Sequence, residues 1–262
     1  APGMAPDTGH MDANGLEASE TLVLGRPKIG HFLDPNGAAR RCLDIGIPEG
    51  VDGAIQTELM TADSIGKIIP QRSARSNKGT FGCSLIVAGS ENYVGAAYLS
   101  SAAAGRAGAG LVTLALPDTI YPLIATRLSE ATYIPLVEHG RNVIDSGFAA
   151  VQVTDASRAA TSMLVGPGLG QTPSAIEFAR SVLLDRREGP RLVIDADALN
   201  SLASVEDWQR RVRGPAILTP HPGEMARLRG SRVEDVERDR VHTAQMAAET
   251  WRHMVVLKGA CT

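Results

Sequence analysis

Short apolar runs rich in valine, isoleucine and leucine alternate with longer segments of helical character from about residue 84 onward. This alternation is typical of βαβ units, so it predicts a layered α/β domain with a mostly parallel sheet over residues 76–262. Several runs are almost continuously aliphatic, which indicates strands covered by helices on both faces. The predicted strands are residues 84–88, 111–115, 163–165, 192–194, 216–219 and 254–257.

Helical character is strongest in three segments between these strands and in one short segment before them. The three segments are residues 94–106, 174–187 and 233–251. The first is rich in small residues, which let a helix pack closely on a sheet. The short segment, residues 61–65, belongs to a connection at residues 51–75 and is predicted to be a helix with Thr61 or Asp63 as its N-cap.

The first 50 residues have a different pattern. Two predicted strands, residues 21–24 and 42–45, are separated by a connection rich in glycine and proline. This is too little chain to bury an independent core, so we expect residues 1–50 to be a partial domain. The sequence begins with Ala1 rather than Met, which indicates a natural start further upstream.

The composition is that of a globular protein, because 44% of the 262 residues are apolar and 21% are charged. The 26 Lys and Arg residues face 29 Asp and Glu, and the net charge of −3 provides no field that would hold nucleic acid. Three cysteines lack metal-ligand spacing, and no apolar run approaches the roughly 18 residues of a membrane span. We therefore expect a cytoplasmic protein without nucleic-acid or membrane partners.

Glycine, proline, aspartate or histidine follows almost every predicted strand. The carboxyl ends of the strands form the ligand crevice of an open parallel sheet, so we expect these residues to converge on one edge. This convergence is the strongest functional signal in the residue pattern. The five clusters are residues 88–90, 166–168, 195–197, 220–223 and 258–259.

Gly166-Pro167-Gly168-Leu169-Gly170 connects a buried strand to a helix expected near Pro173. Glycines let the backbone approach a ligand closely, and amides at a helix N-terminus attract phosphate. An ordinary left-handed turn explains the same residues equally well. The spacing is GxGxG rather than GxGxxG, which disfavours a dinucleotide-binding dehydrogenase.

Asp195 and Asp197 close a strand in the run Asp195-Ala196-Asp197-Ala198-Leu199-Asn200. Carboxylates at this place can accept a ribose hydroxyl, hold a metal-bound water or take up a proton. The alternative is that one aspartate caps the next helix, and for Asp197 this is the favoured interpretation.

His221 lies in the rigid strand-end loop Thr219-Pro220-His221-Pro222-Gly223-Glu224. Two prolines and a glycine around one imidazole would preorganise it toward a ligand. The alternative is a structural turn that places Glu224 in the first turn of a helix.

Lys258 also follows a strand, and a point charge beside flexible backbone is a common way to hold phosphate. Residues 77–82, Asn-Lys-Gly-Thr-Phe-Gly, are a similar and equally weak case. No GxSxG elbow or HExxH helix is present, so the hydrolase and zinc-protease classes have no support. The remaining histidines default to surface or helix positions: His10, His31, His139, His242 and His253.

Taken in order, these clusters resemble the ADP- or ATP-dependent NAD(P)H-hydrate dehydratases of the ribokinase-like superfamily. The resemblance implies a ribokinase-like α/β/α fold and a lyase activity that repairs hydrated nicotinamide nucleotides. The motifs that carry it are residues 78–82, 88–90, 95–97, Arg106 with 108–112, 130–133, 166–170, 195–200, 219–224 and 257–260.

The first 50 residues resemble the end of an NAD(P)H-hydrate epimerase domain, which implies a bifunctional parent protein. The family continues after the lysine motif into a glycine-rich loop with a catalytic aspartate, which we expect to lie beyond Thr262. The chain is therefore expected to be an internal part of that parent, without full activity of its own. The epimerase likeness is carried by residues 7–9, 18–24, 28–31 and 44–48.

The resemblance also implies the reaction and its ligands. Hydroxide leaves poorly from the hydrated ring, so the β-phosphoryl group of ADP would be transferred to the ring hydroxyl and eliminated as phosphate, leaving AMP. Phosphoryl transfer of this kind depends mostly on positioning and electrostatics. The hydrated dinucleotide is assigned to Ala96, Gly168 and His221, with Gly95, Asp195 and Asp197 as further candidates.

The adenine nucleotide, ADP or ATP, is expected to bring Mg²⁺ with it, and no residue of the chain is assigned as a metal ligand. We also expect a homo-oligomer. The residues expected to cradle the nucleotide phosphates are Lys258, Gly259, Ala260, Cys261 and Thr262. Two other interpretations stay open: a ribokinase-like kinase of a small alcohol, and a nucleotide-binding remnant without catalytic activity.

Overall fold

The computed structural model describes residues 3–16, 18–33, 39–48, 50–51, 53–184, 186, 189–260 and 262. The chain divides into two units, the first within residues 1–76 and the second formed by residues 77–260 with Thr262. In the described ranges, no helix has the length and apolar character needed to cross a membrane.

The first unit contains two parallel strands, β1 (Glu20–Leu24) and β2 (Ala39–Leu43), and the short helices α1 (Gly30–Leu33) and α2 (Ala62–Ile68). The prediction of a strand at residues 42–45 is wrong in its bounds. Pairing stops at Leu24 and Leu43 because Gly25 turns the chain with a φ of +73°. Thr61, not Asp63, caps α2, since its hydroxyl accepts the Ser64 amide at 3.2 Å.

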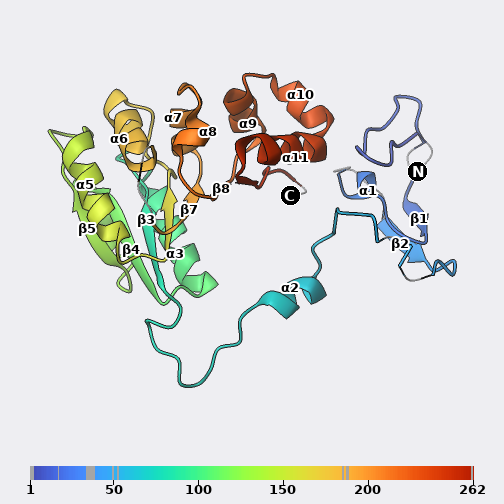
Figure 1. Cartoon of the computed structure of the whole chain (residues 1–262), viewed down its shortest axis with the longest axis horizontal. Coiled ribbons are helices and arrows are strands. Elements are labelled where there is room, and N and C mark those ends of the chain that lie inside the picture. Colours follow the sequence, from blue (N-terminus) through green and yellow to red (C-terminus); the bar gives the residue numbers. More distant parts are fainter. Residues whose placement is uncertain are drawn as a thin grey trace. The chain divides into compact units, whose positions relative to one another are not determined.

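The second unit is built on a sheet of seven parallel strands in the order β5-β4-β3-β6-β7-β8-β9 (Figure 1). The prediction of a layered α/β domain with a mostly parallel sheet is confirmed. The strand order reverses between β3 and β6, which makes this boundary the topological switch point. The strands are β3 (Cys83–Val87), β4 (Leu111–Pro117), β5 (Thr132–Leu136), β6 (Ser162–Val165), β7 (Arg191–Ile194), β8 (Ala216–Leu218) and β9 (Met254–Val255).

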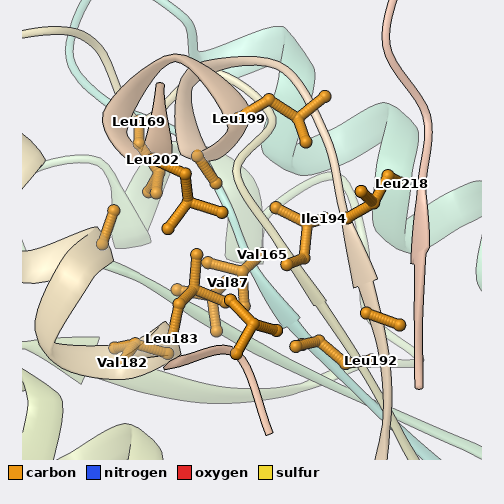
Figure 2. Packing of buried hydrophobic residues seen from close by; sticks show 14 of the residues in the cluster. Val87, Val165, Leu169, Val182, Leu183, Leu192, Ile194, Leu199, Leu202 and Leu218 are labelled. Atoms are coloured by element: carbon orange, nitrogen blue, oxygen red, sulfur yellow. The ribbon is translucent and has the colours of Figure 1, made fainter. Parts of the chain in front are cut away.

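Helices cover both faces of this sheet. Successive side chains of a strand point to opposite faces, so Leu85 and Val87 join the larger hydrophobic cluster while Ile86 and Ala88 join the smaller one. Figure 2 shows part of the larger cluster, in which β7 packs against neighbouring helices. The helices are α3 (Val94–Ala107), α4 (Tyr121–Ala125), α5 (Ser146–Ser157), α6 (Pro173–Leu183), α7 (Asp197–Leu202), α8 (Trp208–Arg211), α9 (Pro222–Arg229), α10 (Val233–Arg238) and α11 (Arg240–Trp251).

Three helices of the second unit show how these layers are built. α3 contributes Ala97 to the smaller cluster, whereas α5 and α6 contribute Val153 and Phe178 to the larger one. In Figure 1, α3 accordingly lies on one side of the strands and α5 and α6 lie on the other. The carboxyl edge of the sheet is left between the two helical layers.

Two predicted helices differ from the structure, the strand expected over residues 254–257 ends at Val255, and one strand of the sheet was not predicted. The helix expected over residues 233–251 breaks at Asp239, whose carboxylate accepts the His242 amide at 3.1 Å and caps α11. The helix expected to reach Arg187 ends at Leu183, because Leu184 is extended. Strand β5 was not predicted because it contains Pro135, a residue that sheets accept at an edge such as this one.

His253 is neither on the surface nor in a helix, contrary to the sequence-based expectation. It is 7% exposed and lies between α11 and β9. Its Nδ1 accepts the Ala216 amide at 3.3 Å and its Nε2 lies 3.2 Å from the Gln209 carbonyl. Burial lowers the pKa of His253 below the ordinary value of 6.5, and the bond to Gln209 offsets only part of this effect.

Candidate functional site

The carboxyl ends of five strands meet on one edge of the sheet in the second unit. Backbone hydrogen bonds continue past the strands themselves and join each end to its neighbour. The Gly166 amide donates to Val87, Asp195 to Val165, Thr219 to Ile194 and Lys258 to Pro220, at 2.9–3.1 Å. All five predicted strand-end clusters therefore lie together at the carboxyl edge.

The glycine turn after β6 brings Ala96 and Gly168 together. Gly168 has a φ of +67°, and a Cβ added there would lie 2.7 Å from the Ala96 Cβ and 2.7 Å from the Tyr93 Cβ. The Gly89 amide donates to Pro167 at 2.8 Å, which ties the end of β3 to this turn. The contact lies at the switch point between β3 and β6, where open α/β sheets bind their ligands.

Gly95 and Ala96 occupy the first turn of α3, beside the glycine turn. Gly95 is exposed, and a Cβ built on it would meet no atom within 4 Å. Ala96 is half-buried. Ala96 lies against Gly168, and Gly95 is open to solvent beside it in the chain.

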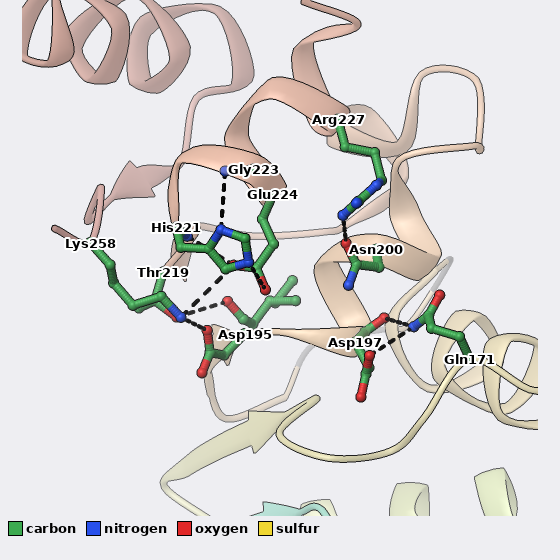
Figure 3. Close-up of polar contacts among 11 residues, drawn as sticks. Gln171, Asp195, Asp197, Asn200, Thr219, His221, Gly223, Glu224, Arg227 and Lys258 are labelled. Atoms are coloured by element: carbon green, nitrogen blue, oxygen red, sulfur yellow. Dashed lines mark hydrogen bonds and ion pairs between the residues drawn. The ribbon is translucent and has the colours of Figure 1, made fainter. Parts of the chain in front are cut away.

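Asp197 does not cap the helix that it begins, so the helix-cap interpretation is wrong. Ala196 is the N-cap of α7, and Asp197 is its first residue. The Asp197 carboxylate instead accepts the Gly170 amide at 2.8 Å. It also accepts the Gln171 side-chain amide at 3.1 Å (Figure 3). Asp197 therefore fixes the glycine turn from the neighbouring strand end.

Ala196 has φ +49° and ψ −119°, a backbone conformation that L residues rarely adopt. The strained peptide lies between Asp195 and Asp197 at the turn from β7 into α7. The carboxylates on either side of it have different partners. Asp197 accepts the Gly170 amide in the turn after β6, and Asp195 accepts a hydrogen bond from Lys258 after β9.

Asp195, Lys258 and Glu224 form a charged group that spans three strand ends (Figure 3). The Lys258 Nζ lies 2.6 Å from Asp195 Oδ1 and 3.8 Å from Glu224 Oε2. Their side chains are 39%, 24% and 4% exposed, in the order Lys258, Asp195, Glu224. One ammonium thus faces two carboxylates, and Lys258 is not a solvated surface lysine.

His221 is the N-cap of α9, and Glu224 is the third residue of that helix. The Gly223 amide donates to His221 Nδ1 at 3.0 Å, and the His221 amide donates to Glu224 Oε2 at 2.8 Å. The imidazole is 54% exposed, so a ligand in the crevice can reach it. Glu224 lies in the first turn of a helix, as the structural-turn interpretation expected. The His221 ring is nevertheless exposed at the carboxyl edge of the sheet.

The residues after Lys258 continue along the same edge. Gly259, Ala260 and Thr262 are exposed, and the Gly259 amide donates to the Thr262 hydroxyl at 3.0 Å. Cys261, expected among the nucleotide ligands, lies outside the described residues. Arg240 donates to the Leu257 and Lys258 carbonyls at 3.1 and 2.8 Å and so anchors this segment to α11.

Several contributors to the site were not identified from the sequence. They are Arg240, which bonds to the segment after β9, and the pair Asn200 and Arg227, whose side chains hydrogen-bond to each other. All three lie on helices, and no short sequence motif shows which helix faces will meet. Conversely, residues 77–82, considered for phosphate binding, precede β3 and pack at the amino edge, where the Gly110 amide donates to Phe81 at 3.3 Å. They are not part of the carboxyl-edge cluster.

A protein-family model described as NAD(P)H-hydrate dehydratase matches residues 84–262, which include every described residue of this edge from Gly89 to Thr262. The chain belongs to the NAD(P)H-hydrate dehydratase family. It is 34% identical over 270 residues to a bifunctional NAD(P)H-hydrate repair enzyme of Moorella thermoacetica, covering 99% of this chain and 49% of that protein. It is also 34% identical over 199 residues to the ADP-dependent (S)-NAD(P)H-hydrate dehydratase of Bacillus subtilis, covering 76% and 66%. The chain thus spans about half the length of the bifunctional relative.

Solved structures that are similar to this chain have the same fold. The ADP/ATP-dependent NAD(P)H-hydrate dehydratase of Bacillus subtilis, co-crystallised with ATP and Mg²⁺, matches with a TM-score of 0.62 and 31% identity over 78% of this chain and 68% of that chain. A ribokinase-like superfamily protein of Enterococcus faecalis matches with a TM-score of 0.63 and 25% identity over 76% and 65%. The ribokinase-like fold predicted for the NAD(P)H-hydrate dehydratase unit is confirmed.

Proposed function

We propose that the full-length protein dehydrates (6S)-NAD(P)H hydrate to NAD(P)H, with ADP or ATP as the co-substrate. The observation that carries this proposal is the meeting of five strand-end clusters at one edge of the sheet, in a chain of the dehydratase family. They lie at the carboxyl edge of the sheet and include the topological switch point between β3 and β6, where open α/β sheets bind their ligands.

The hydrated dinucleotide is proposed to bind Ala96, Gly168 and His221. Ala96 and Gly168 leave little side chain at the switch point, so a flat ring or a phosphate can approach the backbone closely. The half-exposed imidazole of His221 faces the same edge from α9. Gly95, Asp195 and Asp197 complete the proposed substrate site, the carboxylates chiefly by holding their neighbours in place.

The nucleotide phosphates are proposed to lie along Lys258–Thr262, whose exposed backbone follows β9. The Lys258 ammonium is paired with the Asp195 carboxylate, so part of its positive charge is balanced within the protein itself. In the part of the chain described here, no group of three or more His, Cys, Asp or Glu side chains is arranged to hold a metal ion. Mg²⁺ would therefore enter on the nucleotide, as is usual for this ion.

The proposed chemistry transfers the β-phosphoryl group of ADP to the hydroxyl of the hydrated ring, and AMP is the other product. Loss of phosphate and of a ring proton then restores the double bond. Phosphate is a better leaving group than hydroxide, and this explains the need for a nucleotide. The chain's own residues contribute by holding the two ligands in register, which is the larger part of catalysis in phosphoryl transfer.

Residues 1–50 are proposed to be the last part of an epimerase domain, residues 51–75 a connection, and residues 76–262 an incomplete dehydratase domain. The relative with the bifunctional name matches 99% of this chain, whereas the relative named only as a dehydratase matches 76%. We propose a homo-oligomeric, cytoplasmic enzyme without nucleic-acid or membrane partners, which agrees with the free thiols of Cys42 and Cys83.

The test supplies the full-length protein with hydrated NADH, ADP and Mg²⁺ and follows the absorbance of NADH. NADH, AMP and phosphate should form in equal amounts, and omission of ADP should abolish all three. A small-alcohol kinase would instead give a stable phosphorylated product and no NADH. That result, or NADH formation independent of the nucleotide, would refute the proposal.

A further inference from the structure

Glu224 makes more contacts than its position in a helix requires. A glutamate at the third helical position often accepts the amide of the N-cap residue, as Glu224 does for His221 at 2.8 Å. Capping explains neither its 4% exposure nor its second oxygen, which lies 3.4 Å from His221 Nε2. It also leaves unexplained the approach of the Lys258 ammonium at 3.8 Å.

Glu234 provides the comparison, because it is one of the two acidic residues in the first turn of the next helix, α10. Its side chain is 66% exposed and pairs with Arg232 beside it. Glu234 therefore represents an ordinary acidic residue near a helix start. Glu224 differs from it by being buried among three polar groups of the site.

The hydrogen bonds around His221 determine where its ring proton lies. The Gly223 amide donates to Nδ1, so Nδ1 is an acceptor and carries no proton in the neutral ring. The proton of the neutral ring is then on Nε2, on the side of Glu224 Oε1. At 3.4 Å this contact is longer than an optimal hydrogen bond. Nε2–H thus keeps the capacity to donate to an oxygen atom of a bound ligand.

We propose that Glu224 is a positioning residue that orients the Nε2–H of His221, whose tautomer the Gly223 amide sets, as a donor to an oxygen of the hydrated nicotinamide ring, and that Glu224 couples His221 to the Lys258–Asp195 pair. The hydrogen bonds of His221 with Gly223 and Glu224 support the orientation of the ring. The coupling between α9 and the end of β9 rests on the Glu224 carboxylate, which lies near both His221 and Lys258. The ligand named here rests on the proposed function.

The test compares Glu224→Gln with Glu234→Gln in the full-length protein. Glutamine at position 224 keeps an acceptor for the His221 amide but removes the charge. The first measurement is the nitrogen NMR spectrum of the histidine rings, with His221→Gln used to assign the His221 signals. The wild-type ring should show protonated Nε2 and unprotonated Nδ1. Glu224→Gln should shift the Nε2 signal, because the carboxylate beside Nε2–H is lost, while Nδ1 stays unprotonated as the acceptor of the Gly223 amide. Glu234→Gln should shift neither signal.

The second measurement separates positioning from folding. Glu224→Gln should raise KM for the hydrated dinucleotide about tenfold, the effect of one weakened hydrogen bond of about 1.4 kcal/mol, while the unfolding midpoint changes little. A wild-type ring protonated on Nδ1, or unchanged ring signals in Glu224→Gln, would overturn the proposal, as would a KM equal to that of Glu234→Gln. If the wild-type enzyme released no NADH, the proposed reaction would fail, and the ring spectra would still decide the role of Glu224.

Discussion

The Lys258 Nζ lies 2.6 Å from the Asp195 Oδ1, and this pair reaches across the end of a whole strand. Asp195 follows β7 and Lys258 follows β9, while β8 lies between them in the sheet. The pair therefore ties the ends of β7 and β9 together through side chains, across the end of β8, in addition to the backbone bonds. Disturbing it is expected to affect both the stability of this edge and the ligands proposed to bind there.

Lys258→Met and Asp195→Asn should each lower the free energy of unfolding, by about 1–3 kcal/mol, because each leaves a partly buried charge without its partner. The double variant should lose about 1 kcal/mol less than the sum of the two single losses. Urea unfolding of the four proteins measures this coupling. Strictly additive losses would mean that the pair contributes nothing, and the coupling should shrink in high salt because Lys258 is partly exposed.

Gly166→Ala should destabilise the protein by more than about 3 kcal/mol or prevent folding. Gly166 has a φ of +131°, and an added Cβ would collide with the Asp195 carbonyl oxygen. The matched control is Gly214→Ala, where φ is +77° but no atom lies within 4 Å of the added Cβ. The control should lose about 1 kcal/mol from backbone strain alone. Equal losses in urea unfolding would show that the close approach at Gly166 is unimportant.

Ala196→Gly should raise the free energy of unfolding by about 1 kcal/mol, because glycine adopts the backbone conformation of residue 196 without strain. Ala203→Gly, at a regular position with φ −58° after the same helix, should lower it by about 0.5–1 kcal/mol. Thermal or urea unfolding gives the two signs. A loss of stability in Ala196→Gly would contradict the presence of strain at this turn.

The stability of the protein should fall as the pH drops below about 6.5, partly because of His253. Burial keeps the folded-state pKa of His253 below 6.5, so between the two pKa values the unfolded chain binds more protons than the folded one. The contribution is complete above the unfolded pKa and is lost as the pH falls toward the folded one. Urea unfolding at several pH values measures the slope.

His253→Gln removes this titration, so its stability should depend less on pH between 7 and 5 than that of the wild type. His242→Gln, at an exposed position of α11, is the matched control and should keep the wild-type slope. A wild-type slope in His253→Gln would show that other groups carry the dependence.

The strands and their converging ends could be predicted because both depend on local information. An aliphatic run followed by glycine, aspartate or histidine needs only the rule that parallel strands end on the same edge, which brought Gly168, Asp195, His221 and Lys258 together. The predicted helix bounds were wrong where a single residue decides whether a helix continues. Asp239 interrupts a helix that is otherwise continuous in pattern.

The partners of these residues could not be predicted, because their distances depend on tertiary packing. Nothing in the spacing shows that Asp197 reaches the Gly170 amide rather than its own helix, or that Lys258 meets Asp195, 63 residues earlier. Glu224 was visible as a capping acid, but its contact with Lys258 requires β8 and β9 to be neighbours.

The position of β3 beside β6 has a consequence for how the protein folds. All other neighbours in the seven-stranded sheet are consecutive along the chain, whereas Cys83 and Thr161, which hydrogen-bond at the start of this boundary, are 78 residues apart. Closing so long a loop costs more conformational entropy than pairing parallel strands that are consecutive along the chain, and distant contacts slow folding. Two half-sheets should therefore form first and join late. Because Gly168 meets Ala96 on this boundary, a ligand held there would bind only the joined state and would slow its separation.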